Sequence, residues 1–143
     1  MLRVKEDKMQ FMTHLSFNGD CEAAFRLYEK CFGREITLML TYGESPMAST
    51  APGLEDKIVH ATLKVGDYTL TGADVPPDRY EKPQGFAVQL NIGDPGEAER
   101  IFNTFAEGGV VGMSLEETFW AKRYGMVTDR FGTPWEINCE RAS

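Results

Sequence analysis

The chain has 143 residues, a formal net charge of −7 and a hydrophobic fraction of 42%. This length suits one compact domain with a real core, and the acidic balance argues against nucleic acid or an anionic membrane as a partner. No apolar run approaches the roughly 18 residues of a membrane span, and the polar start MLRVKEDK is unlike a signal peptide. We therefore expect a cytoplasmic protein.

The first half of the chain predicts a strand, a helix and three further strands. Apolar and polar residues alternate over 11–17, and Asp20 is a typical N-cap for the helix that follows. Residues 21–32 place apolar side chains on one helical face, and Gly33 is suited to end that helix. The remaining strands are expected at 35–41, 57–65 and 68–72. The segment 43–56, rich in Gly, Pro and Ser, is expected to be a loop.

The second half repeats this order after a proline-rich linker at residues 76–82. The predicted elements are a strand at 86–92, a helix at 96–107, a strand starting at 110–113, a polar and aromatic connection over 114–123, and a hairpin of strands at 125–130 and 134–139.

Individual residues repeat as well. Leu15, Phe17, Gly19, Asp20, Ala24, Arg26, Leu27 and Tyr28 are echoed by Leu90, Ile92, Gly93, Asp94, Ala98, Arg100, Ile101 and Phe102. A period this long, present twice, indicates a duplicated module rather than a solenoid. We predict an α+β fold of two tandem βαβββ modules, 9–75 and 83–142, in one domain. Their mixed sheets should be curved with the helices outside, and Gly66 should superpose on Gly132 and Leu70 on Glu136.

Strand alternation predicts which side chains face away from the helices. Those expected there are Met12, His14, Ser16, Ile58, His60, Thr62, Gln89, Glu136 and Asn138. Both histidines of the chain fall on this face, together with Glu136. Imidazole and carboxylate groups bind metals or form acid–base pairs. Solvated or hydrogen-bonded polar residues are the simpler interpretation.

Two other groups of residues have a functional and a structural interpretation. Aromatic side chains near the C-terminus form either a ligand-site wall or part of the core: Phe119, Trp120, Tyr124, Phe131 and Trp135. Cys21, Cys31 and Cys139 have neither metal-type nor redox spacing and are expected to be buried free thiols. The alternative for Cys21 is a thiolate activated by the helix N-terminus.

Three segments of the chain, FNGDCEAAFRLYEKCFG, DKIVHATLKVGDYTLTGAD and TFWAKRYGMVTDRFGTPWEINCE, resemble the PhnB-like branch of the glyoxalase/bleomycin-resistance superfamily, also called the vicinal oxygen chelate fold. The resemblance covers Met9 to Glu140. It implies two βαβββ modules, a homodimer and ligand cavities in the sheet concavities. Members of the branch also carry a demethylubiquinone methyltransferase-like domain label, but the chain lacks the Gly-rich loop that S-adenosylmethionine binding requires.

Metal-dependent members of the superfamily take ligands from the first and last strand of each module. The resemblance places these positions at Met12, Leu70, Ala87 and Glu136, of which only Glu136 is a ligand type. His14 and His60 are the candidate substitutes. A complete metal site and a cofactor are therefore not expected, and a divalent metal held by His14, His60 and Glu136 is the alternative.

Two functions remain as hypotheses, with a purely structural dimerisation module as a third. The first is a protein that binds a small apolar or aromatic molecule in a cavity between the modules without a complete metal site. The residues expected to line that cavity are Met12, Ser16, Thr62, Gln89, Phe119, Trp120 and Asn138. The second is a lyase, isomerase or transferase in which His14, His60 and Glu136 are catalytic, with or without a metal.

Overall fold

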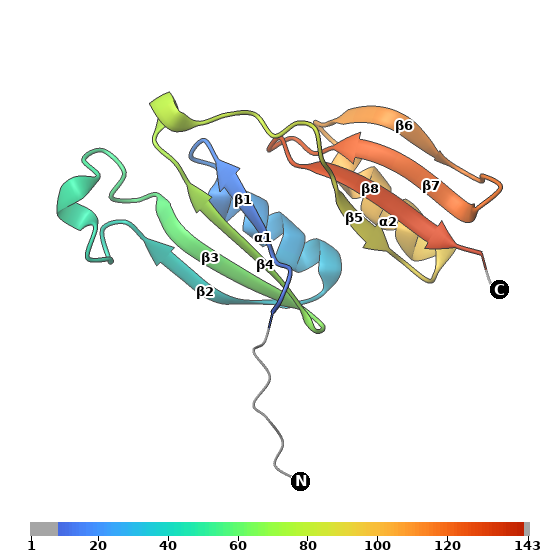
Figure 1. Cartoon of the computed structure of the whole chain (residues 1–143), viewed down its shortest axis with the longest axis horizontal. Helices are drawn as coiled ribbons and strands as arrows, with labels where there is room; N and C mark the ends of the chain where they lie inside the picture. The colour runs from blue at the N-terminus through green and yellow to red at the C-terminus, as the bar shows by residue number, and fades with distance from the viewer. Residues whose placement is uncertain (1–8, 142–143) are drawn as a thin grey trace, which may run out of the picture.

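The computed structural model describes residues 9–141 and contains two four-stranded sheets with one helix each (Figure 1). The polar start over residues 1–8 lies outside the described residues. The first module consists of β1 (Thr13–Phe17), α1 (Cys21–Phe32), β2 (Glu35–Thr41), β3 (Ile58–Val65) and β4 (Tyr68–Asp74). Short 3-10 helices lie in the loop after β2 (Ala48–Thr50) and after β4 (Pro77–Arg79).

The second module repeats the order of the first. It consists of β5 (Val88–Asn91), α2 (Pro95–Ala106), β6 (Val110–Glu116), β7 (Ala121–Thr128) and β8 (Pro134–Glu140). The expected connection over 114–123 was wrong, because β6 continues to Glu116 and β7 already begins at Ala121. The β6–β7 pairing contains two register shifts, which interrupt the alternation that would have revealed the strands.

The strand orders are β1-β4-β3-β2 and β5-β8-β7-β6, with β1–β4 and β5–β8 parallel and the other neighbours antiparallel. Figure 1 shows α1 and α2 packed behind their sheets, so that one face of each sheet is left open. This arrangement confirms the predicted α+β class with two βαβββ modules. None of the described helices has the length and hydrophobicity needed to span a membrane.

The registers of the two parallel pairs show how the modules correspond. The pairs are Thr13 with Leu70, His14 with Thr71, Val88 with Trp135, and Gln89 with Glu136. Leu70 therefore corresponds to Trp135, and Thr71 to Glu136, so the predicted superposition of Leu70 on Glu136 was wrong by one residue. The cause is the turn length, because two residues join β3 to β4 whereas five join β7 to β8.

A single hydrophobic core joins both modules. The helices contribute their buried faces, Cys21, Ala24, Phe25, Tyr28 and Cys31 from α1 and Ala98, Ile101, Phe102 and Phe105 from α2. Trp135 is 1% exposed and packs at 5.3 Å from Tyr28 and 4.7 Å from Phe105, between ring centroids. Trp135 belongs to the core and Phe131 packs against the core, whereas Trp120 does neither.

The N-terminus of α1 is capped by a distant carboxylate. Asp20 makes no side-chain cap, contrary to expectation. The buried Asp74 accepts hydrogen bonds from the backbone N–H groups of Cys21 and Ile58, each at 2.9 Å. The bond to Ile58 holds this residue in the core, although Ile58 was expected on the open face. The prediction was wrong because the β2–β3 pairing has a register shift at Ile58. Gly33 ends α1 in the left-handed conformation, as predicted.

A second buried carboxylate connects the modules. Asp129 accepts hydrogen bonds from the Tyr28 hydroxyl (2.5 Å), Trp135 Nε1 (2.9 Å) and the backbone N–H groups of Phe131 (2.9 Å) and Thr133 (3.1 Å). Burial and the Asp129 carboxylate raise the pKa of Tyr28, so its hydroxyl remains a donor. This network fixes α1 of the first module against the last hairpin of the second.

Candidate functional site

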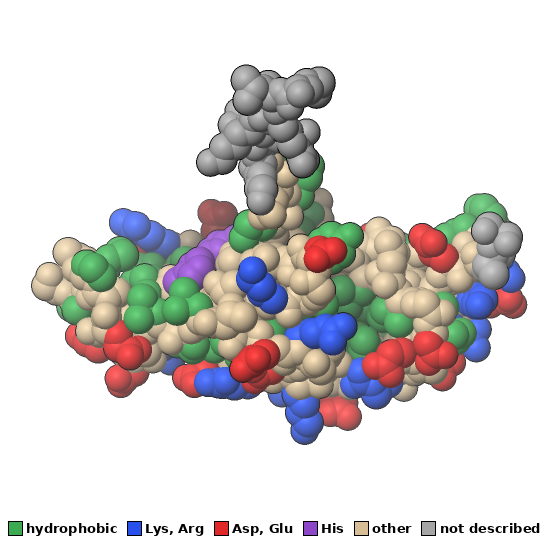
Figure 2. All heavy atoms as spheres, turned by 90° about the horizontal axis from the view of Figure 1, so that it is seen from below, with side chains coloured by type: hydrophobic (Ala, Val, Ile, Leu, Met, Phe, Trp, Pro, Cys, Tyr) green, Lys and Arg blue, Asp and Glu red, His purple; other side chains and the backbone are tan. Residues whose placement is uncertain are grey.

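The open face of the first sheet carries both histidines. His14 on β1 and His60 on β3 stack with ring centroids 6.4 Å apart and an interplanar angle of 18°. His14 Nδ1 is 2.7 Å from Thr71 Oγ1, and His60 Nε2 is 3.2 Å from Thr62 Oγ1. Figure 2 shows the histidine side chains at the surface beside hydrophobic ones. Each imidazole thus keeps one ring nitrogen outside these contacts.

The pKa of His14 is lowered from 6.5 by burial and by the charge of His60. The His14 imidazole therefore binds a proton more tightly in the unfolded chain than in the folded one. As a result, the free energy of unfolding falls as the pH drops from 6.5 toward the lower pKa of the folded state. We expect an NMR titration of the His14 ring to give a pKa below 6.5 in the wild type. His60→Gln should raise that pKa because it removes a repelling charge. An unchanged His14 pKa in this variant would contradict the coupling.

A small cavity of about 270 Å³ lies beside His14. Ser16 of β1 also lines it, and its other wall comes from the segment after β4, including Arg79, Glu81 and Phe86. Two of the residues expected in the site therefore line the same small cavity, next to the linker between the modules.

The open face of the second sheet carries Glu136. Its Oε1 accepts a hydrogen bond of 2.6 Å from the Tyr124 hydroxyl, and this bond raises the pKa of Tyr124. The ring centroid of Trp120 is 5.3 Å from that of Tyr124 and 4.7 Å from that of Phe119. Phe119, Trp120 and Tyr124 therefore form a row of aromatic side chains at the point where β7 begins, and the last of them is bonded to the Glu136 carboxylate.

An amide row lies beside Glu136 on the same face. Asn91 Oδ1 accepts hydrogen bonds from Gln89 Nε2 (3.1 Å) and Asn138 Nδ2 (3.0 Å). Asn138 is 6% exposed, and its Oδ1 has no hydrogen-bond partner among the described residues. The row therefore leaves one buried acceptor, Asn138 Oδ1, without a partner among the described residues.

The three candidate catalytic or metal-binding residues are divided between two sheets. His14 and His60 lie on the first sheet and Glu136 on the second. Glu136 on β8 corresponds to Thr71 on β4, so only one of these two equivalent positions carries a metal-ligating residue. Within residues 9–141, no three His, Cys, Asp or Glu side chains form a group that could hold a metal ion. The described residues of one chain therefore do not bring together a ligand set that fits a divalent metal.

The cysteines are buried free thiols. Burial, with a smaller contribution from Asp74, raises the pKa of Cys21, and burial raises that of Cys31 to about 11. A thiolate at the N-terminus of α1 is therefore disfavoured, and the alternative of an activated Cys21 was wrong.

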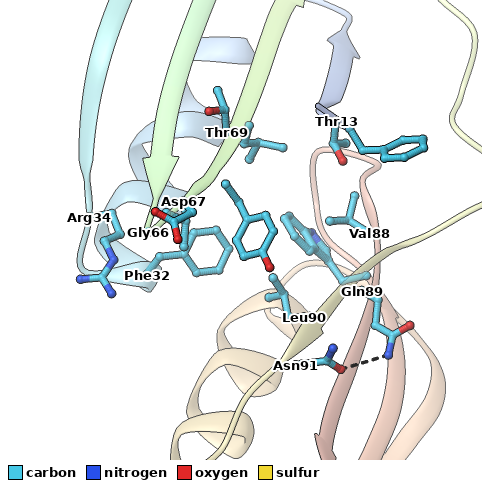
Figure 3. A pocket seen from close by; sticks show the side chains of 15 residues that line it. Thr13, Phe32, Arg34, Gly66, Asp67, Thr69, Val88, Gln89, Leu90 and Asn91 are labelled. Carbon is cyan, nitrogen blue, oxygen red and sulfur yellow. Dashed lines mark hydrogen bonds between the residues drawn. The ribbon is translucent and has the colours of Figure 1, made fainter. Parts of the chain in front are cut away.

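A second cavity, of about 630 Å³, lies between the modules (Figure 3). Its walls include Phe32 at the end of α1, Tyr68 at the start of β4, Val88 of β5, and Trp135. Of the residues expected to line a ligand cavity, only Gln89 borders it. Its lining comes from the turn before β4 and the edges of β1 and β5, which strand alternation within single elements does not bring together.

The comparisons with known proteins agree with this geometry. A profile of the Glyoxalase/Bleomycin resistance protein/Dioxygenase superfamily matches residues 11–137. Protein YjdN of Escherichia coli (strain K12) is 32% identical over 139 residues, which cover 91% of this chain and 95% of that protein.

Two solved structures resemble the chain over nearly its whole length. The crystal structure of protein PA1353 from Pseudomonas aeruginosa is 43% identical with a TM-score of 0.87, over 94% of this chain and 100% of that one. A Bacillus cereus structure, described as a putative 3-demethylubiquinone-9 3-methyltransferase, PhnB protein, is 24% identical with a TM-score of 0.77, over 92% of this chain and 99% of that one. The chain therefore belongs to the glyoxalase/bleomycin resistance protein/dioxygenase superfamily.

Proposed function

We propose that the protein binds a small aromatic or apolar molecule on the open face of its second sheet, without needing a metal ion. The observation that carries the proposal is the exposed aromatic pair Phe119 and Trp120 beside the hydrogen-bonded Tyr124 and Glu136. Phe119 is 90% and Trp120 47% exposed, and rings of this size supply most of the contact area for a small ligand. Three free cysteines are in keeping with a cytoplasmic location.

Binding is favoured over acid–base catalysis by the separation of the candidate groups. A general acid and base must both reach the reacting atoms. Within one chain, the stacked imidazoles of His14 and His60 lie on a different sheet from Glu136, whose carboxylate is engaged by Tyr124. The enzyme hypothesis thus has no complete constellation among the described residues.

A fluorescence titration with N-phenyl-1-naphthylamine, an uncharged aromatic probe, tests the proposal on protein treated with a chelator. We expect saturable binding that Trp120→Ala weakens by about 5- to 10-fold, because a central aromatic contact is worth about 1 kcal/mol or more. Tyr68→Ala is the matched control, since Tyr68 is an exposed aromatic residue that lines the cavity between the modules. No binding, or a loss in the Tyr68 variant instead, would refute the proposal.

We also propose that the chain forms a homodimer through the cavity between the modules. The edge strands β1 and β5 border this cavity, and Phe11 at its rim is 97% exposed. Open edges and exposed apolar side chains are normally covered, and an isologous contact with a second copy would cover both edges at once.

Light scattering checks the dimer directly. We expect a mass of twice 16.0 kDa for the wild type and a shift toward 16.0 kDa for Phe11→Asp. Met47→Asp, which places the same charge on an exposed apolar residue of the loop after β2, should leave the mass unchanged. A wild-type mass of 16.0 kDa at micromolar concentration would count against the dimer.

A further inference from the structure

Three aromatic rings at the start of β7 lie at steep angles to one another. The interplanar angle is 79° between Phe119 and Trp120 and 66° between Trp120 and Tyr124. Rings in this arrangement present π faces in different directions instead of stacking against each other. A group that lies in the angle between two neighbouring rings contacts both of their π faces, and π faces attract cations.

Acceptor groups surround Tyr124 on every neighbouring strand. Glu116 on β6 and Asn138 on β8 are its direct partners in the two strand pairings, and opposite residues present their side chains to the same face. Only one oxygen of the Glu136 carboxylate, Oε1, accepts a hydrogen bond from the Tyr124 hydroxyl. The Oδ1 of Asn138 is buried and has no partner among the described residues.

The Glu136 carboxylate is not neutralised by a neighbouring cation. No Lys or Arg of the described residues lies within ion-pair distance of it. Arg123 on β7 pairs with Glu99 on α2, and Lys122 makes no ion pair with Glu136. The half-buried Glu136 carboxylate therefore lies beside Tyr124 with no cationic partner among the described residues.

We propose that Trp120, Tyr124 and Glu136 bind a small organic cation, an alkylated ammonium group attached to an apolar or aromatic body. The inference rests on the proposed function and adds the charge of the ligand to it. The ammonium group lies against the π faces of Trp120 and Tyr124, where the quadrupole attracts it. Glu136 supplies the counter-charge, and the apolar body lies against Phe119.

Two probes of nearly equal shape separate charge from shape. Benzyltrimethylammonium carries the cation, and neopentylbenzene replaces its nitrogen by carbon. The side-chain indole N–H of Trp120 reports binding by NMR, and that of Trp135, buried and bonded to Asp129, is the internal reference. We expect the cation to bind at least about fivefold more tightly than the neutral probe, in line with a cation–π contact at a partly exposed site plus a counter-charge.

Glu136→Gln removes the charge and keeps the shape of the side chain. It should weaken binding of the cation about fivefold and leave the neutral probe within about twofold, with a melting temperature within a few degrees of the wild type. Glu107→Gln makes the same chemical change at the exposed end of α2 and should alter neither affinity. If Glu136→Gln fails to fold, Trp120→Leu at an exposed position serves instead, with binding followed by the backbone amide shifts of residues 121–126, and should abolish the preference for the cation.

The outcomes distinguish this inference from the function on which it rests. Equal affinities for the two probes, or an unchanged preference in Glu136→Gln, would overturn the cation site while leaving aromatic binding intact. Failure of both probes to move the Trp120 signal would overturn both proposals.

Discussion

Asp129→Ala is expected to lower the free energy of unfolding by about 3–5 kcal/mol, because it leaves several buried donors without an acceptor. Asp129 is 3% exposed and accepts four hydrogen bonds, two of them from the Tyr28 hydroxyl and the Trp135 indole. Tyr28 belongs to the first module and Trp135 to the second, so the loss should affect both modules in one cooperative transition. Urea unfolding followed by circular dichroism measures the effect.

Graded variants test the explanation for Asp129. Tyr28→Phe removes a single donor and should cost about 1–2 kcal/mol. Asp78→Ala, at an exposed position in the segment after β4, should change the stability by less than about 0.5 kcal/mol. A loss in Asp129→Ala no larger than that in Asp78→Ala would contradict the network.

Asp74→Ala is expected to cost about 2–4 kcal/mol, because two backbone donors lose their buried acceptor and α1 loses its cap. The carboxylate of Asp74 is 1% exposed and bonds the N–H groups of Cys21 and Ile58. Asp20→Ala is the matched control, since Asp20 stands at the N-cap position without a side-chain cap. Thermal unfolding of both variants should show a large loss for Asp74 alone, whereas a larger loss for Asp20 would show that the sequence-based assignment was correct.

Local patterns in the sequence were sufficient for most of the fold. The helix at Cys21–Phe32 and the strand at Glu35–Thr41 have the predicted bounds, because side-chain periodicity and a C-cap glycine are properties of adjacent residues. The duplication predicted the second module. Errors occur where a bulge breaks the alternation, as at Ile58 and in β6.

The two structural carboxylates illustrate what local patterns miss. Asp74 bonds to Cys21 across 53 positions of the chain, and Asp129 to Tyr28 across 101. Neither partner is visible from spacing along one element. The adjacent Asp20 is a reasonable cap by composition, but tertiary structure brings the Asp74 carboxylate to the first N–H group of the helix.

The candidate site was predictable in its parts but not in its arrangement. Alternation predicted that His14, His60 and Glu136 lie on the face away from the helices, whereas their distance from one another depends on how the modules pack. Trp120 and Trp135 are close in sequence, yet one is half exposed and the other lies in the core. Only the packing of β8 on α2 distinguishes the two roles.

The most direct measurement is a map of backbone amide shifts as N-phenyl-1-naphthylamine is added to the isotopically labelled protein. The proposed site predicts that the largest shifts fall at residues 120–126 and 136–138, on the open face of the second sheet. Shifts concentrated at residues 32–34 and 65–70 would place the ligand in the cavity between the modules and contradict the proposed site.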